Sequence, residues 1–126
     1  MSPVDPTSAQ VSALAASSHE GPVQMINLLR FRPDGGREGY ARYMEAVTPH
    51  LEAVGAHVVA LGAARVVVIG DTERPWWDAI LTVEYPSVAA FLQMVTSEHY
   101  QAITHLRTDA LERAELIATA PGTIDA

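Results

Sequence analysis

One amide side chain stands out because its neighbours are apolar. Asn27 lies in the run Val23 to Phe31, and in an extended strand its side chain shares a face with Met25 and Leu29. A polar amide among apolar side chains must find hydrogen-bond partners. Asn27 therefore either orients the carbonyl group of a bound substrate or satisfies backbone groups nearby, and the sequence leaves both interpretations open.

Two arginines lie on the other face of the same run. The side chains of Arg30 and Arg32 alternate with those of Leu29 and Phe31, so they point away from Asn27. A guanidinium group in this position either binds the carboxylate or enolate of a ligand or forms a surface or dimer ion pair. We favour the ion pair for both residues.

The five histidines are candidates for acid–base chemistry, because imidazole titrates near neutral pH. They are His19, His50, His57, His99 and His105. We expect most of them to be ordinary surface groups. His99 and His105 share one segment with Tyr100 and Arg107, and these four side chains could form the polar wall of a pocket.

Aromatic side chains could supply the rest of such a pocket and hold a planar ligand. The residues concerned are Tyr40, Tyr43, Trp77, Phe91 and Tyr100. Aromatic side chains at helical spacing are more often part of an ordinary core than of a binding site. We prefer the core interpretation and keep the aromatic pocket as its alternative.

Several familiar chemistries lack their motifs in this chain. There is no cysteine, which removes thiolate nucleophiles and zinc-thiolate or iron–sulfur sites. No His-x-His or His-Glu-x-x-His spacing is present, so we expect no metal site, and no clear proximal ligand for haem is found. Phosphate-binding glycine loops and the Gly-x-Ser-x-Gly motif are also missing. We therefore expect no cofactor.

Composition and net charge limit the classes of partner that we expect for this chain. The 126 residues suit one domain, and 48% of them are hydrophobic. Eight Lys and Arg against fifteen Asp and Glu give a net charge of −7, the wrong sign for binding nucleic acid. There is neither an apolar run of about 18 residues nor a secretory signal pattern, so we expect a soluble cytoplasmic protein with no membrane contact.

The positioning elements follow from hydrophobic periodicity. We expect strands at 23–31, 57–61 continuing with a kink through 65–69, 77–85 and 115–119. Helices are expected at 38–54, closed by Gly55, at 88–95, capped by Ser87, and within 97–111. The order β-α-β-β-α-α-β predicts an α+β fold, the ferredoxin-like split β-α-β with an antiparallel sheet. Its helices would cover one face, and the aliphatic residues of the other face predict a homodimer.

Residues 1–20 contain few large apolar side chains, so we interpret them as a flexible N-terminal arm. A short helix over Ser8 to Ala16 is compatible with the alanine content, and it could pack on a partner subunit. Residues 21–126 form the single domain.

Four stretches of the chain resemble the domain-of-unknown-function 1330 family over most of residues 22–120. They are VQMINLLRF, YARYMEAVTPHLEAVGA, WWDAILTVEYPSVAAFLQMV and ALERAELIAT. The resemblance implies a dimeric α/β barrel. That superfamily includes cofactor-free monooxygenases of antibiotic biosynthesis, muconolactone isomerases and haem-using peroxidase relatives, so the fold alone does not select one chemistry.

Residues and resemblance together lead to a functional hypothesis. We expect a small-molecule-binding protein, and the resemblance suggests a cofactor-independent enzyme, monooxygenase-like or isomerase-like, for a small aromatic or enolisable compound. The alternative is a non-catalytic ligand-binding or structural homodimer. The predicted pocket residues are Asn27, Tyr40, Tyr43, Trp77, His99, Tyr100, His105 and Arg107.

Overall fold

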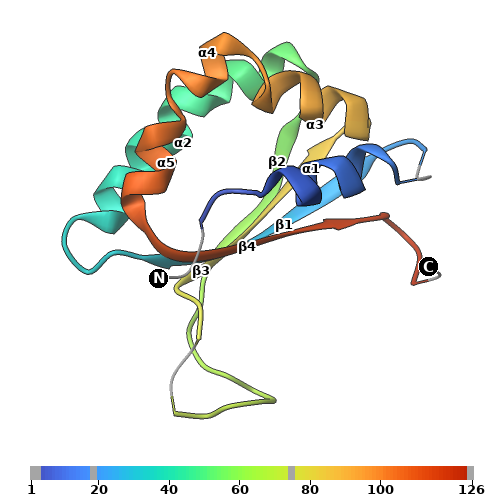
Figure 1. The fold of residues 1–126 in the computed structure, drawn as a ribbon. Coiled ribbons are helices and arrows are strands. Elements are labelled where there is room, and N and C mark those ends of the chain that lie inside the picture. The colour runs from blue at the N-terminus through green and yellow to red at the C-terminus, as the bar shows by residue number, and fades with distance from the viewer. Residues whose placement is uncertain (1–3, 18–19, 74–75, 125–126) are drawn as a thin grey trace.

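Four strands form one antiparallel sheet in the computed structural model, which describes residues 4–17, 20–73 and 76–124 (Figure 1). The strands are β1 (Val23–Phe31), β2 (His57–Ala63), β3 (Ala79–Tyr85) and β4 (Leu111–Thr119). Their spatial order is β2-β3-β1-β4, with every neighbouring pair antiparallel. This is the order of a split β-α-β fold, so the predicted α+β ferredoxin-like fold is confirmed.

The helices lie on one face of this sheet (Figure 1). They are α1 (Ser8–Ala15), α2 (Gly36–Ala53), α3 (Val88–Val95), α4 (Glu98–Gln101) and α5 (Thr104–Ala110). The predicted spacing of α2 is confirmed, because Tyr40, Tyr43, Val47 and Leu51 are buried on its inner face. The helix permitted by the alanine content before residue 17 is also present as α1. Within the described residues, no helix has the length and apolar content needed to cross a membrane.

Strict alternation in β1 positions the central polar group. Met25, Asn27 and Leu29 are buried on the face that carries the helices, while the residues between them are half-buried. Asn27 lies opposite Leu81 of β3 and Leu116 of β4. The amide therefore sits near the middle of the sheet, beneath the helix layer.

Small residues bring α5 close to the start of α2. A Cβ atom added at Gly36 would lie 2.7 Å from the backbone oxygen of Ala110, and one at Gly39 would lie 3.3 Å from the Cβ of Ala110. Only glycine allows so close an approach of the two backbones. Arg107 lies one turn before Ala110 and is thereby held over the sheet.

Three strand boundaries differ from the predictions. The expected continuation of the second strand through 65–69 is wrong, since β2 ends at Ala63, opposite the first residue of β3. One more backbone hydrogen bond follows, from the nitrogen of Ala64 to the oxygen of Asp78 at 2.9 Å, and beyond it no strand pairs with the apolar run within the described residues. β3 begins at Ala79 rather than Trp77. The last strand starts early, at Leu111, because β4 pairs with β1 as far as Phe31.

One face of the sheet and one loop leave large apolar side chains exposed. On the face away from the helices, Ile80 is 44% and Ile117 is 47% exposed. Residues 64–73 extend away from the sheet (Figure 1), and Val68 and Ile69 of this loop are 87% and 93% exposed. Surfaces of this kind usually mark an interaction site.

Candidate functional site

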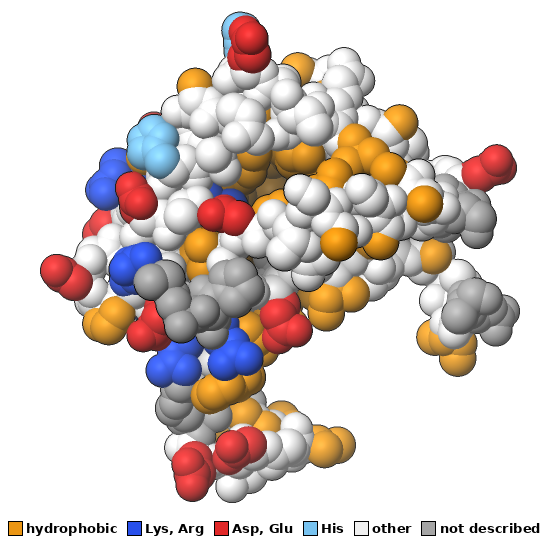
Figure 2. Space-filling model, in the orientation of Figure 1, with side chains coloured by type: hydrophobic (Ala, Val, Ile, Leu, Met, Phe, Trp, Pro, Cys, Tyr) orange, Lys and Arg blue, Asp and Glu red, His pale blue; other side chains and the backbone are white. Residues whose placement is uncertain are grey.

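A cavity of about 690 Å³ lies between the sheet, the inner faces of the helices and the N-terminal segment. Its wall is mostly apolar, and Figure 2 shows hydrophobic side chains inside a hollow between the helices. The polar lining includes Asn27, Tyr40, Tyr43, Tyr85, Tyr100 and Arg107. A concave apolar site with a few converging polar groups is the usual form of a small-molecule pocket.

Asn27 presents only its oxygen to this cavity. Its Nδ2 donates to the backbone oxygens of Met25, at 3.3 Å, and of Leu81, at 3.2 Å. Both partners are acceptors, so the amide nitrogen must face them. The Oδ1 atom makes no hydrogen bond, yet no shielded side-chain oxygen or nitrogen in the described part of the chain lacks a partner. Oδ1 is therefore open to the cavity and suits a ligand donor, such as a hydroxyl, rather than a carbonyl.

Four tyrosine side chains line the cavity, three from the helices and one, Tyr85, from β3. The hydroxyls of Tyr43 and Tyr100 are 2.8 Å apart, so one donates to the other and the proton of the acceptor hydroxyl remains free for a third group. Burial raises the pKa of Tyr40 to about 12. Burial, reinforced by the neighbouring Tyr100, also raises the pKa of Tyr43 and that of Tyr85. These tyrosines are neutral donors at physiological pH and do not act as bases.

Arg107 brings a positive charge to the cavity wall. It is 9% exposed, and its Nη1 donates to the backbone oxygen of Val4. The same nitrogen lies 3.9 Å from Oδ1 of Asp5. Both partners belong to the N-terminal segment, which the sequence interpretation placed outside the domain.

This N-terminal segment covers one side of the cavity. Val4 and Leu14 pack against the core, and α1 lies against α3. Thr7 caps α1 by accepting from the backbone nitrogen of Gln10, whose side chain accepts from the backbone nitrogen of Thr7. The sequence contained this capping pattern, but it gave no sign that the helix would close a pocket formed by residues about a hundred positions away.

The structure brings five of the eight predicted pocket residues together and places three elsewhere. Trp77 precedes β3, so strand alternation does not direct it inward, and its ring lies 5.7 Å from the guanidinium of Arg113. His99 and His105 are exposed and do not line the cavity. On α5 the inward residues are Arg107 and Ala110, and His105 lies about 200° around the helix from Arg107.

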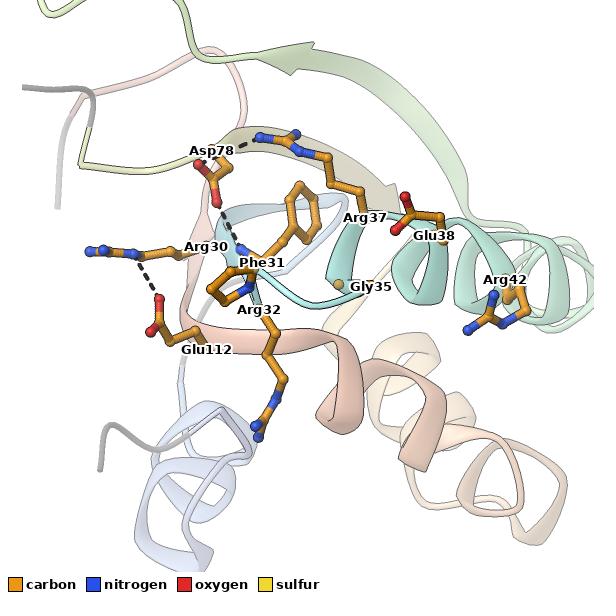
Figure 3. A pocket seen from close by; sticks show the side chains of 11 residues that line it. Arg30, Phe31, Arg32, Gly35, Arg37, Glu38, Arg42, Asp78 and Glu112 are labelled. Atoms are coloured by element: carbon orange, nitrogen blue, oxygen red, sulfur yellow. Dashed lines mark hydrogen bonds and ion pairs between the residues drawn. The ribbon is translucent and has the colours of Figure 1, made fainter.

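A second hollow, of about 550 Å³, lies on the surface where β1 leads into α2 (Figure 3). It contains two ion pairs: Arg30 Nε lies 2.9 Å from Glu112, and Arg37 lies 3.7 Å from Asp78. The other charged side chains of its lining, Arg32, Glu38 and Arg42, form no ion pair among the described residues. Asp78 also accepts from the backbone nitrogen of Phe31 at 2.9 Å. The ion pair favoured for Arg30 is thus confirmed, whereas Arg32 is exposed and forms none with the described residues. We interpret these ion pairs as contacts that hold the ends of the strands together, and we do not interpret the hollow as a binding site.

Metal-binding groups do not gather in the described ranges: no three His, Asp or Glu side chains there could hold one ion. The carboxylates on the cavity lining are Asp5 and Glu115, and Glu115 is exposed on the edge strand β4. The cavity thus offers an open amide oxygen, neutral hydroxyl donors and the guanidinium of Arg107, while the second arginine of the lining, Arg113, stacks on the rings of Trp76 and Trp77. Such a set can bind and orient the polar end of an otherwise apolar molecule.

The chain is similar to several solved structures. A protein of unknown function from Rhodopseudomonas palustris, RPA0582, is 34% identical with a TM-score of 0.89, covering 98% of this chain and 99% of that one. A dimeric ferredoxin-like protein from Thermobifida fusca is 13% identical, with a TM-score of 0.56 and coverage of 83% and 95%. A putative antibiotic biosynthesis monooxygenase from Bacteroides thetaiotaomicron is 19% identical, with a TM-score of 0.54 and coverage of 82% and 91%. The latter two show the fold alone.

No curated protein of known function matches the sequence. The model of a family described as a domain of unknown function, DUF1330, matches residues 35–120. This match spans more than half of the chain and agrees with the resemblance carried by its strand and helix motifs. The chain belongs to the DUF1330 family.

Proposed function

We propose that the protein binds a small, largely apolar molecule in the cavity above Asn27. One observation carries this proposal: the unpaired Oδ1 of Asn27 opens into an apolar space of about 690 Å³. Because Oδ1 is exposed to the cavity rather than shielded, it can accept a hydrogen bond from a group placed there. A ligand with a hydroxyl or amine donor would supply that bond. A purely structural role does not account for either the cavity or the open acceptor.

A cofactor-independent enzyme is the second candidate, and the donors beside Asn27 favour it. The free hydroxyl proton of the Tyr43–Tyr100 pair and the guanidinium of Arg107 line the same cavity. Donors of this kind stabilise the oxygen of an enolate, which is the form in which an enolisable compound reacts. The monooxygenase-like neighbour is similar in fold alone. It supports the candidate only as a precedent for the fold.

The binding proposal predicts an effect of the change Asn27→Leu. We use 1-naphthol as the probe, because it joins an aromatic body to one hydroxyl donor. Titration calorimetry should show binding to the natural protein, weakened by about 1 to 3 kcal/mol in Asn27→Leu because one hydrogen bond is lost. Leucine has the same number and branching of side-chain heavy atoms as asparagine, so thermal melting should still show a cooperative transition. Native mass spectrometry of the purified protein should also detect a retained small molecule.

The matched control is Gln93→Leu, which replaces an exposed amide of α3 that does not line the cavity. It should leave 1-naphthol binding unchanged. Absence of both a retained molecule and naphthol binding would contradict the proposal, as would equal losses in the two variants. Conversion of the naphthol to a naphthoquinone in air would favour the enzyme over simple binding, because the naphthol itself then supplies the two electrons and two protons that reduce the second oxygen atom of O2 to water.

We also propose that the protein is a cytoplasmic homodimer. The uncovered sheet face supports this, because Ile26, Leu28, Ile80 and Ile117 form an apolar centre there. The projecting loop 64–73 adds further exposed aliphatic side chains, which a second chain could cover. The neighbour from Thermobifida fusca is described as dimeric, which is consistent with such an assembly.

The dimer proposal predicts that Ile80→Arg produces a folded monomer. A charge in the centre of a buried interface would lose its hydration without gaining a partner. Sedimentation equilibrium should give twice the mass of the chain for the natural protein and a single mass for the variant. Ile124→Arg is the control, because Ile124 is fully exposed and lies beyond the last strand. A natural protein that is monomeric at every concentration would overturn the proposal.

A further inference from the structure

Arg107 is a nearly buried cation whose partners all come from one segment. Among the described residues, its guanidinium makes one hydrogen bond, to the backbone oxygen of Val4, and one ion pair, with Asp5. In the part of the chain that the structure describes, no carboxylate of the surrounding helices and strands forms an ion pair with it. A buried charge is tolerated when it is paired and hydrogen-bonded, so the domain itself leaves this charge incompletely neutralised.

The remaining donors of the guanidinium are accessible. Arginine carries five N–H groups, and the Nε and Nη2 atoms of Arg107 make no hydrogen bond in the described structure. Since no shielded side-chain nitrogen there lacks a partner, these atoms border open space. Arg107 lines the cavity, which places donors of a planar fork at its wall. Such a fork matches the two oxygens of a carboxylate.

Asp5 is a weak substitute for a ligand carboxylate. Its Oδ1 lies 3.9 Å from Nη1 of Arg107, beyond hydrogen-bond distance, and it accepts instead from Oγ1 of Thr108 at 3.0 Å. The Asp5 side chain is 55% exposed, so its attraction to Arg107 is screened by solvent. A carboxylate bound from within the cavity could reach the guanidinium with better geometry and less screening.

We infer that the cavity selects a small organic carboxylate, bound through Arg107 in competition with Asp5 of the N-terminal segment. The inference rests on the proposed binding function and specifies its ligand class: an apolar body that carries one carboxylate in addition to the donor that meets Asn27. The apolar wall and the tyrosine hydroxyls hold the body of the ligand. We expect a monoanion, because Arg113, the second arginine of the lining, holds its guanidinium over the rings of Trp76 and Trp77, at 5.0 Å and 5.7 Å from their centroids.

The test compares two probes of nearly the same shape, 1-naphthoate and its neutral amide, 1-naphthamide. Titration calorimetry at neutral pH should show that the natural protein binds the carboxylate about tenfold or more tightly than the amide, because hydrogen bonds to charged groups are the stronger ones. This comparison needs no variant. It stands even if changes at Arg107 reduce the stability of the fold.

Three variants locate the effect. Arg107→Gln should remove the preference for the carboxylate and leave the affinity for the amide within about twofold, since only the charge-assisted bonds are lost. Arg107→Lys should keep part of the preference, because it keeps the charge and loses the fork. Asp5→Asn should strengthen carboxylate binding a fewfold by removing the competitor. Arg42→Gln, on the exposed face of α2 and outside the cavity lining, is the control for a change in net charge.

The outcomes separate this inference from the proposed function. If 1-naphthol binds in an Asn27-dependent way but carboxylate and amide bind equally, the cavity is a binding site and the inference about its ligand is wrong. A preference that survives in Arg107→Gln, or that falls equally in Arg42→Gln, also overturns it. Unchanged carboxylate affinity in Asp5→Asn removes the competition with the N-terminal segment. If none of the three naphthalene probes binds, both the function and the inference fail.

Discussion

Alkaline pH is expected to destabilise the folded chain, with a slope that approaches about 4 kcal/mol per pH unit as the pH rises above 10. The ordinary tyrosine pKa is 10.0, and burial raises the pKa of Tyr40 to about 12 in the folded state. The pKa values of Tyr43 and Tyr85 are also raised by burial. Each such group contributes about 1.4 kcal/mol per pH unit, and the three contributions act in the same direction.

The direction follows from the protons bound in each state. Well below pH 10 the three tyrosines are protonated in both the folded and the unfolded chain, so they do not contribute to the pH dependence of the free energy of unfolding. Above pH 10 the unfolded chain releases these protons while the folded chain keeps them. The free energy of unfolding therefore falls as the pH rises, until the folded groups titrate as well.

Urea unfolding at a series of pH values from 8 to about 11 measures the effect. The absorbance of phenolate should rise at the unfolding transition and not before it. Tyr85→Phe should reduce the slope by about a third, because the Tyr85 hydroxyl makes no hydrogen bond that the change would remove. Folded protein whose tyrosines titrate near pH 10, with constant stability, would contradict the assigned burial.

Local periodicity predicted most of the fold, and its failures share one cause. Alternation placed Met25, Asn27 and Leu29 on one face, and helical spacing placed Tyr40 and Tyr43 against it. The run 65–69 has strand-forming side chains, but it forms no strand because no partner strand lies beside it. Strand propensity describes a suitable surface, and the hydrogen bonds of a sheet depend on neighbours that periodicity cannot locate.

The candidate site shows the same division between local signals, which the sequence carries, and distant contacts, which it does not. Asn27 could be found because a lone amide interrupts an apolar face, a signal local to one strand. The pairing of Arg107 with Val4 and Asp5 joins residues about a hundred positions apart, and a single sequence carries no signal of that contact. The histidines drew attention through their chemistry, yet their helical phase relative to Arg107 and Tyr100 turned them outward. The amide acceptor and the guanidinium, rather than imidazole, define what this cavity can bind.

Leu29→Ala is expected to lower the free energy of unfolding by about 3 to 5 kcal/mol, toward the upper end of the range for such a change. Leu29 is 0% exposed on β1, an inner strand of the sheet. Its neighbours across the two adjacent strands are Ala79 and Ala114. Neither alanine can extend into the space left by the missing side chain, so the cavity should remain largely open and its cost should be nearly complete.

Leu61→Ala is the matched control for this prediction, because it makes the same chemical change in a strand of the same sheet. Leu61 lies on β2 and is 61% exposed, so its truncation should cost less than about 1 kcal/mol. Urea unfolding of both variants at one protein concentration keeps any contribution from association the same. The slope of the transition should stay unchanged in each, since the surface exposed on unfolding hardly differs. A loss at Leu29 no larger than the loss at Leu61 would mean that the layer between the sheet and α2 is not tightly packed. The cavity beside Asn27 would then lack the rigid sheet surface on which its ligand selection depends.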